Sequence, residues 1–145
     1  MITYKKEFSE LTTKEFYEIA KLRVSVFVVE QNCPYQEIDE EDETALHLWL
    51  EEENEIVGYA RIMDNKETAS FGRVLVNPKY RGQGLGRTLV DEVLSEIAQR
   101  YPNKTILIGG QAYLKEFYES FGFQTISDIY LEDDIPHYQM ERLPD

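Results

Sequence analysis

The chain has 145 residues and 42% of them are apolar, so we expect one folded domain spanning residues 1–145. The 28 Asp and Glu against 15 Lys and Arg give a net charge of −13, which predicts no nucleic acid and no membrane partner, because both attract basic surfaces. A single cysteine excludes an intrachain disulfide and a cysteine-rich zinc site, and it favours a cytoplasmic location.

The N-terminal segment predicts a strand and then a helix. Apolar and polar residues alternate over 2–8, which is typical of a strand. Thr12 and Glu15 have the spacing of a capping box, and the apolar stripe behind them predicts a helix that runs to about Glu30. Residues 24–29 include four valines, which also suit a strand, so this stretch stays ambiguous.

The middle of the chain predicts a loop, a β-hairpin and a further strand. Residues 30–43 show no periodicity, and a loop of this length often has a function. Apolar residues on both sides of an acidic turn predict a hairpin over 46–63. Residues 69–76 predict the next strand, which Pro78 ends.

The C-terminal half alternates between helices and strands. Leucine, valine and isoleucine recur every fourth position over 85–97, which predicts a helix. Residues 105–108 predict a buried strand, and residues 112–121 a short helix. Residues 124–131 and 137–142 suit a closing antiparallel pair, so the fold class is α+β with a mixed sheet.

The segment 73–87 leads from a strand through three glycines into a helix. The start of a helix presents free N–H groups and a partial positive charge, and glycines let those amides approach an oxyanion closely. Residues 72–90 contain four basic residues and no acidic one, in a chain that is acidic overall. We therefore expect a phosphate or pyrophosphate site, with a solvated turn before an ordinary helix as the alternative. A Walker A loop is excluded because no Gly-Lys-Ser/Thr follows, and a dinucleotide-binding fingerprint is disfavoured because the strand ends at Asn77-Pro78, several residues before the first glycine.

Two motifs in the chain point to a known family. Arg81-x-x-Gly84-x-Gly86, after Val-Asn-Pro at 76–78, resembles the acetyl-CoA pyrophosphate loop of the GCN5-related N-acetyltransferases, the GNAT superfamily. Tyr118-x-x-x-Gly-Phe resembles the end of the family's helix after the fifth strand. Residues 22–35 and 134–137 are also similar to the ElaA-like subgroup, and together the matches span nearly the whole chain.

The resemblance implies a GNAT-type sheet of six to seven mostly antiparallel strands, flanked by about four helices, with splayed fourth and fifth strands. Acetyl-CoA, as cosubstrate, would enter between these two strands and bind backbone groups of the fourth strand and the glycine-rich turn. The residues that the resemblance implies for this binding are Leu75, Val76, Arg81, Gly82, Gln83, Gly84, Gly86, Arg87 and Gln111. At the position of Gln111 the family often has an Asn that contacts the pantetheine, so this sequence departs from the family pattern there.

By the same resemblance Tyr118 is the expected general acid, because a phenol is protonated at neutral pH and can protonate a departing thiolate. A core tyrosine is the alternative. An amine acceptor must lose a proton before it attacks, and His47, Glu30 and His137 are the candidate bases, none of them preferred. Arg73 suits the orientation of the acceptor loop through a carboxylate.

Two further features of the sequence favour structural roles. Cys33 has acidic neighbours, which do not favour a reactive thiolate, so we expect it to pack in the fold. The acidic stretches 37–43 and 132–134 are expected to be solvated, unless they line the acceptor cleft and attract a cationic amine.

These residues predict an acetyl-CoA-dependent N-acetyltransferase that works without a metal, by direct attack in a ternary complex. The acceptor would be a primary amine of a small molecule, a peptide or a protein, and a homodimer is possible. The alternative is a non-catalytic acyl-CoA-binding sensor or interaction module.

Overall fold

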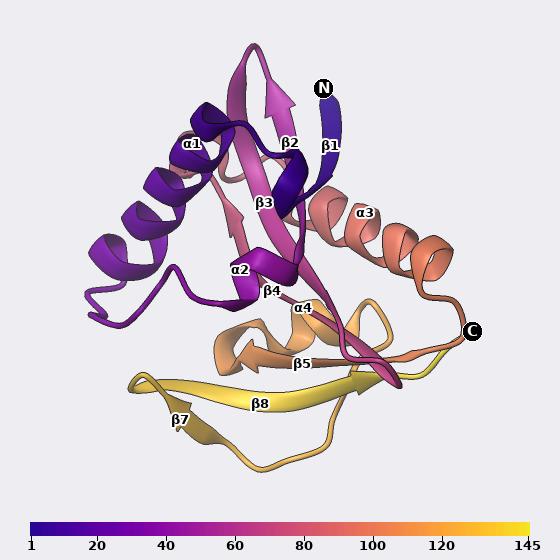
Figure 1. The fold of residues 1–145 in the computed structure, drawn as a ribbon. Helices are drawn as coiled ribbons and strands as arrows, with labels where there is room; N and C mark the ends of the chain where they lie inside the picture. Colours follow the sequence, from indigo (N-terminus) through magenta and orange to yellow (C-terminus); the bar gives the residue numbers. More distant parts are fainter.

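A computed structural model describes all residues, 1–145, as one mixed sheet with helices on both faces (Figure 1). The strands are β1 (Ile2–Glu7), β2 (Leu46–Glu52), β3 (Glu55–Asp64), β4 (Thr68–Val76), β5 (Thr105–Gln111), β6 (Gln124–Thr125), β7 (Tyr130–Glu132) and β8 (Ile135–Arg142). Their order is β1-β2-β3-β4-β5-β8-β6, with β7 also paired to β8, and only β4 and β5 run parallel. The predicted fold class is confirmed. The sheet has eight strands because the predicted strand 124–131 divides into β6 and β7.

The helices are α1 (Thr13–Arg23), α2 (Glu41–Thr44), α3 (Leu85–Arg100) and α4 (Lys115–Glu119). Short 3₁₀ turns lie at Phe8–Glu10, Pro78–Tyr80 and Ala112–Leu114. None of the helices is long and apolar enough to cross a membrane.

Local signals account for the way α1 begins and ends. The predicted capping box is confirmed, because the Thr12 hydroxyl accepts from the Glu15 amide at 3.0 Å and the Glu15 carboxylate accepts from the Thr12 amide at 2.9 Å. The ambiguous valine-rich stretch is helical, but it continues α1 as a π-helix over Val24–Glu30. The predicted loop after it is shorter than expected, since α2 occupies its end.

Both faces of the central strands are buried, which explains why apolar residues of β2 lie on both faces of the sheet. Leu48 and Leu50 pack on the α3 side against Leu89, while Trp49 packs on the α1 side with Ile19. Figure 1 shows α1 and α3 on either side of this part of the sheet.

The fourth and fifth strands separate, as predicted. β4 pairs with β5 only at Thr68 and Ala69. Against β3, residues 73 and 74 of β4 oppose the single Ala60, and Arg73 has a positive φ of 51°. The bulge bends β4, and the edge of β4 that faces β5 has no strand partner from residue 70 onward.

Candidate active site

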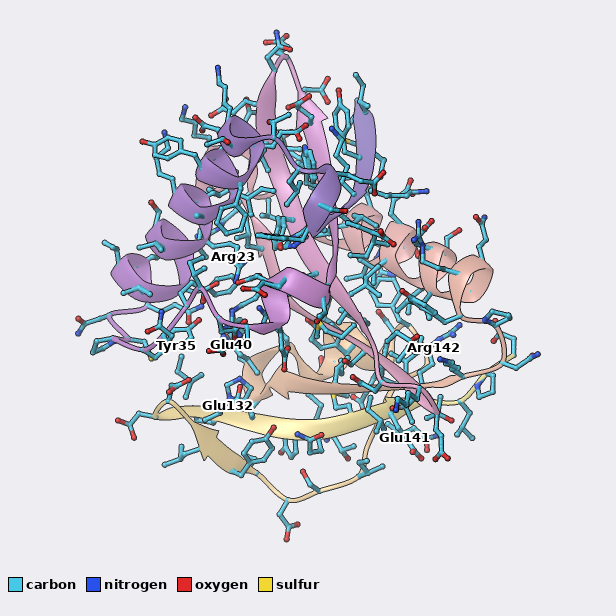
Figure 2. The ribbon with its side chains drawn as sticks, in the orientation of Figure 1. Arg23, Tyr35, Glu40, Glu132, Glu141 and Arg142 are labelled. Carbon is cyan, nitrogen blue, oxygen red and sulfur yellow. The ribbon has the colours of Figure 1, made fainter.

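A cavity of about 1160 Å³ lies where β4 and β5 part. Its wall includes Gly86 and Tyr118 from the side of α3 and α4, and Cys33 and Tyr35 from the side of the loop after α1. In Figure 2, Tyr35 lies above the tip of the β7–β8 hairpin, where Glu132 is labelled. The cavity therefore connects the two faces of the sheet through the opening between its parted strands.

The glycine-rich turn has the backbone that its sequence predicts. Gly82 and Gly84 have φ values of 82° and 77°, the left-handed region that favours glycine. Gly84 is the N-cap of the 16-residue helix α3, so the amides of the first turn, Leu85 to Arg87, lack helical partners. A ligand oxyanion placed here would meet several N–H groups and the positive end of the helix dipole.

The two arginines of this turn already have partners. Arg81 binds the Glu30 carboxylate through two nitrogens at 2.5 and 2.8 Å, and both side chains are partly exposed. Hydrogen bonds from Arg81 hold the pKa of Glu30 below its usual value, which makes Glu30 a weak base. Arg87 donates to the Ser120 hydroxyl at 2.8 Å and lies over the Phe121 ring.

The sequence-predicted cofactor residues divide into two groups. Five of them line the cavity: Leu75, Val76, Arg81, Gly86 and Gln111. The other four, Gly82, Gln83, Gly84 and Arg87, lie on the adjoining turn and the first turn of α3. Leu75 and Val76 also belong to the edge of β4 that has no strand partner, so their β5-facing backbone groups can bind a ligand.

Tyr118 belongs both to the hydrophobic core and to the cavity wall. The structure is therefore compatible with both interpretations of this residue, a core tyrosine and a tyrosine that faces the ligand. Its ring packs against Phe117 and Phe123, and 5% of its surface is exposed. Burial raises the pKa of Tyr118 to about 12, so the phenol keeps its proton at neutral pH. Gly110 makes room for it, since a Cβ there would lie 3.2 Å from the Tyr118 ring.

The structure separates the two candidate histidines. His47 is fully buried outside the cavity wall, with Nδ1 2.6 Å from the Tyr59 hydroxyl and Nε2 2.9 Å from the Asp42 carbonyl oxygen. Burial lowers the pKa of His47. It is a structural residue and cannot reach an acceptor in the cavity, which corrects its place among the candidate bases. His137 lines the cavity.

Buried ion pairs beside the cavity join the loop after α1 to the sheet. Arg23 binds Glu37 at 2.8 Å and Asp42 at 2.6 Å, and Figure 2 shows Arg23 between α1 and α2. Arg61 binds Asp39 at 2.6 Å, and its Nε is a buried nitrogen without a hydrogen-bond partner. The prediction of a solvated acidic stretch is wrong for Glu37 and Asp42, which are 3% and 1% exposed.

Arg73 makes a carboxylate contact of the kind that its position predicts. Its guanidinium lies 2.9 Å from the Glu37 carboxylate and 3.4 Å from Asp39, and it also covers the Tyr35 ring. Arg73 lies in the bulge of β4 and has a positive φ, and its side-chain contacts hold the loop after α1 against β4. Sequence reasoning missed Arg23 and Arg61, because no local pattern marks partners that lie 14 to 22 residues away.

Cys33 is buried and packs in the fold, as its sequence neighbours predict. Its Sγ donates to the Asp133 carbonyl at 3.1 Å, and burial together with the charges of Asp133 and Asp134 raises the pKa of the thiol. We expect iodoacetamide at pH 8 to leave the folded protein unmodified and to alkylate it once urea unfolds it, as intact mass shows. Rapid alkylation of the folded chain would contradict this assignment.

The chain belongs to the GNAT acetyltransferase family. The family described as acetyltransferase (GNAT) domain matches residues 9–144. Protein ElaA of Escherichia coli is 42% identical over 139 residues, which cover 92% of this chain and 91% of that protein. The crystal structure of E. coli ElaA covers 97% of this chain and 98% of its own, with a TM-score of 0.92 and 39% identity. An acyl-CoA N-acyltransferase from Pseudomonas aeruginosa, with the same coverage of both chains, gives a TM-score of 0.93 at 36% identity. Family and fold together identify the class of activity as acyl transfer.

Proposed function

We propose that this chain is an acetyl-CoA-dependent N-acetyltransferase that acetylates a primary amine by direct attack in a ternary complex. The observation behind the proposal is the single cavity between β4 and β5, which extends from Gly86 at the start of α3 to Tyr118 and on to the loop after α1. A cofactor and an acceptor that enter from opposite faces of the sheet would meet inside it. A cytoplasmic location belongs to the same proposal.

The residues present fit acetyl-CoA. The positive-φ turn at Gly82 and Gly84 leaves open space, since a Cβ at either glycine would meet no atom within 4 Å. The diphosphate would accept from the first amides of α3, and the pantetheine arm would pair with the free edge at Leu75 and Val76. To reach the diphosphate, Arg81 would exchange its pair with Glu30 for a phosphate.

The chemistry divides between backbone and side chain. Acetyl-CoA supplies the activated acetyl group as a thioester. An amide of the β4 edge would stabilise the charge that develops on the thioester oxygen. Tyr118, protonated at neutral pH, would give its proton to the departing sulfur.

A transfer assay decides between catalysis and the alternative of a non-catalytic acyl-CoA-binding module. The full chain is incubated with acetyl-CoA and a panel of small primary amines, amino acids and lysine peptides, and released thiol and acetylated product are measured together. We expect stoichiometric product with at least one acceptor. Tight acetyl-CoA binding without transfer to any of them would favour the sensor.

We expect Tyr118→Phe to lower kcat about a hundredfold, because the phenol proton is lost while the ring still packs. The affinity for acetyl-CoA, measured by isothermal titration calorimetry, should stay within about twofold, since the hydroxyl makes no contact with the diphosphate turn. Tyr17→Phe, at an exposed tyrosine of α1 outside the cavity wall, is the matched control and should leave kcat unchanged. Unaltered turnover in Tyr118→Phe would remove Tyr118 from the role of acid.

A further inference from the structure

His137 and Glu132 form a titratable pair in the β7–β8 hairpin, and both line the cavity. The Nε2 of His137 lies 3.5 Å from the Glu132 carboxylate, and its Nδ1 lies 2.6 Å from the carbonyl oxygen of Ile135. A carbonyl oxygen can only accept, so Nδ1 must carry the hydrogen, and the neutral ring then has its lone pair on Nε2. The backbone therefore holds the ring in the tautomer that accepts a proton at Nε2.

His137 and Tyr118 approach the cavity from opposite faces of the same strand pair. A Cβ at Gly110 of β5 would point at the Tyr118 ring. The next residue, Gln111, faces the other way, and it lies directly opposite His137 of β8, with which it shares a face. A thioester between β4 and β5 would therefore have a phenol on one side and an imidazole on the other.

The surroundings of His137 suit a proton acceptor. Two titratable groups of β7 face the ring, the Glu132 carboxylate and the Tyr130 ring at 5.9 Å, and Gln111 of β5 opposite is uncharged. Next along the wall, the Cys33 thiol is engaged by the Asp133 carbonyl. Glu132 is the one formal charge in contact with the ring, so a proton taken up at Nε2 would have a carboxylate partner.

We propose that His137 is the general base, with Glu132 as the residue that stabilises its protonated form; this rests on the proposed function. An ammonium acceptor gives one proton to Nε2, and the freed nitrogen lone pair forms the C–N bond to the acetyl carbon. The C–S bond breaks with its electrons on sulfur, which takes the Tyr118 proton. The excess proton on nitrogen then returns to the Tyr118 oxygen and the imidazolium releases its proton to water, so one proton is released per amide formed.

The pH profile of kcat/KM, with the amine of the panel that is acetylated fastest, tests this role. With His137 the rate should rise until the imidazole is neutral and then stay level up to the pKa of the ammonium, near 10. His137→Gln should be about a hundredfold slower at pH 7 and should gain about tenfold per pH unit, approaching the wild type at high pH. A deficit that is equal at every pH, or no deficit, would overturn the proposal.

Variants of two carboxylates test whether Glu132 assists His137 in the reaction or only contributes to the fold. Glu132→Gln should lower kcat/KM across the level region, because the imidazolium formed during attack loses its carboxylate partner. Glu141→Gln is the control, because it removes a charge from β8, the strand of His137, at a position outside the cavity. It should leave the pH profile unchanged. An identical pH profile of kcat/KM in the wild type, Glu132→Gln and Glu141→Gln would exclude a role for Glu132.

The tautomer can be measured without any acceptor. The chain has two histidines, so the imidazole ¹⁵N spectrum of the full protein is assigned by comparison with His137→Gln. We expect the neutral ring of His137 to carry its hydrogen on Nδ1, and an Nε2–H tautomer would refute the base. If no amine of the panel is acetylated, the proposed function fails, and the tautomer still decides the geometry on which the base depends.

Discussion

Arg23→Met is expected to be among the most destabilising single changes in the chain. Arg23 has no exposed surface and binds Glu37, Asp42 and the Tyr59 hydroxyl. Methionine keeps much of the packing of the stem but leaves two buried carboxylates with fewer partners, which costs about 3–5 kcal/mol. Thermal unfolding at pH 7 should show a midpoint lower by roughly 10 °C for a domain of this size.

Arg100→Met is the matched control, because Arg100 is partly exposed and pairs with Glu96 on the same helix at 3.0 Å. It should cost less than about 1 kcal/mol. Equal midpoints for the two variants would show that the buried ion pairs do not stabilise the fold.

The effect of Arg23→Met should also depend on pH. Burial is the largest single influence and would raise the pKa of Asp42, but the hydrogen bonds and charge of Arg23, the Asp39 amide and the charge of Arg61 together outweigh it and hold the pKa below its usual value. A lowered pKa means that the stabilisation is present at neutral pH and is lost as the pH falls through the folded-state pKa, below about 4. The difference between wild type and variant should therefore shrink in acid, and urea unfolding at pH 7 and pH 3 measures it.

The parts of the fold that short-range signals determine were predictable. The capping box at Thr12, the β-hairpin and the glycine-rich turn each depend on residues within a few positions of one another, and all three are confirmed. The splayed strands came from the resemblance and are confirmed as well. The functional roles of Tyr118 and of the cofactor residues stay predictions, because the structure gives the positions of these residues and not their activity.

The rest could not be predicted because it depends on tertiary contacts. Arg23 lies on the helix predicted from Thr12 to about Glu30, but only the fold brings Glu37 and Asp42 to it. The π-helix over Val24–Glu30 has no composition that distinguishes it from an α-helix or a strand. The three candidate bases were equivalent in sequence, and the structure separated the two histidines because His137 lines the cavity while His47 lies outside it.

Gly84→Glu is expected to abolish acetyl-CoA binding while the protein stays folded. A Cβ at this position meets no atom within 4 Å, so the side chain has room, and the cost to folding is the positive φ of 77°. The new carboxylate would lie at the N-terminus of α3, where the dipole attracts it. It would then occupy the place proposed for the diphosphate and repel it.

Isothermal titration calorimetry should show acetyl-CoA affinity weaker by roughly a thousandfold or more, about 4 kcal/mol, which combines repulsion, bulk and the loss of free amides. Gly84→Asn separates these effects from strain, because asparagine tolerates the left-handed region and adds no charge. It should retain affinity within about tenfold, and both variants should unfold within a few degrees of the wild type. Normal affinity in Gly84→Glu would mean that the diphosphate binds elsewhere, and the cavity between β4 and β5 would then lose its connection to the glycine-rich turn.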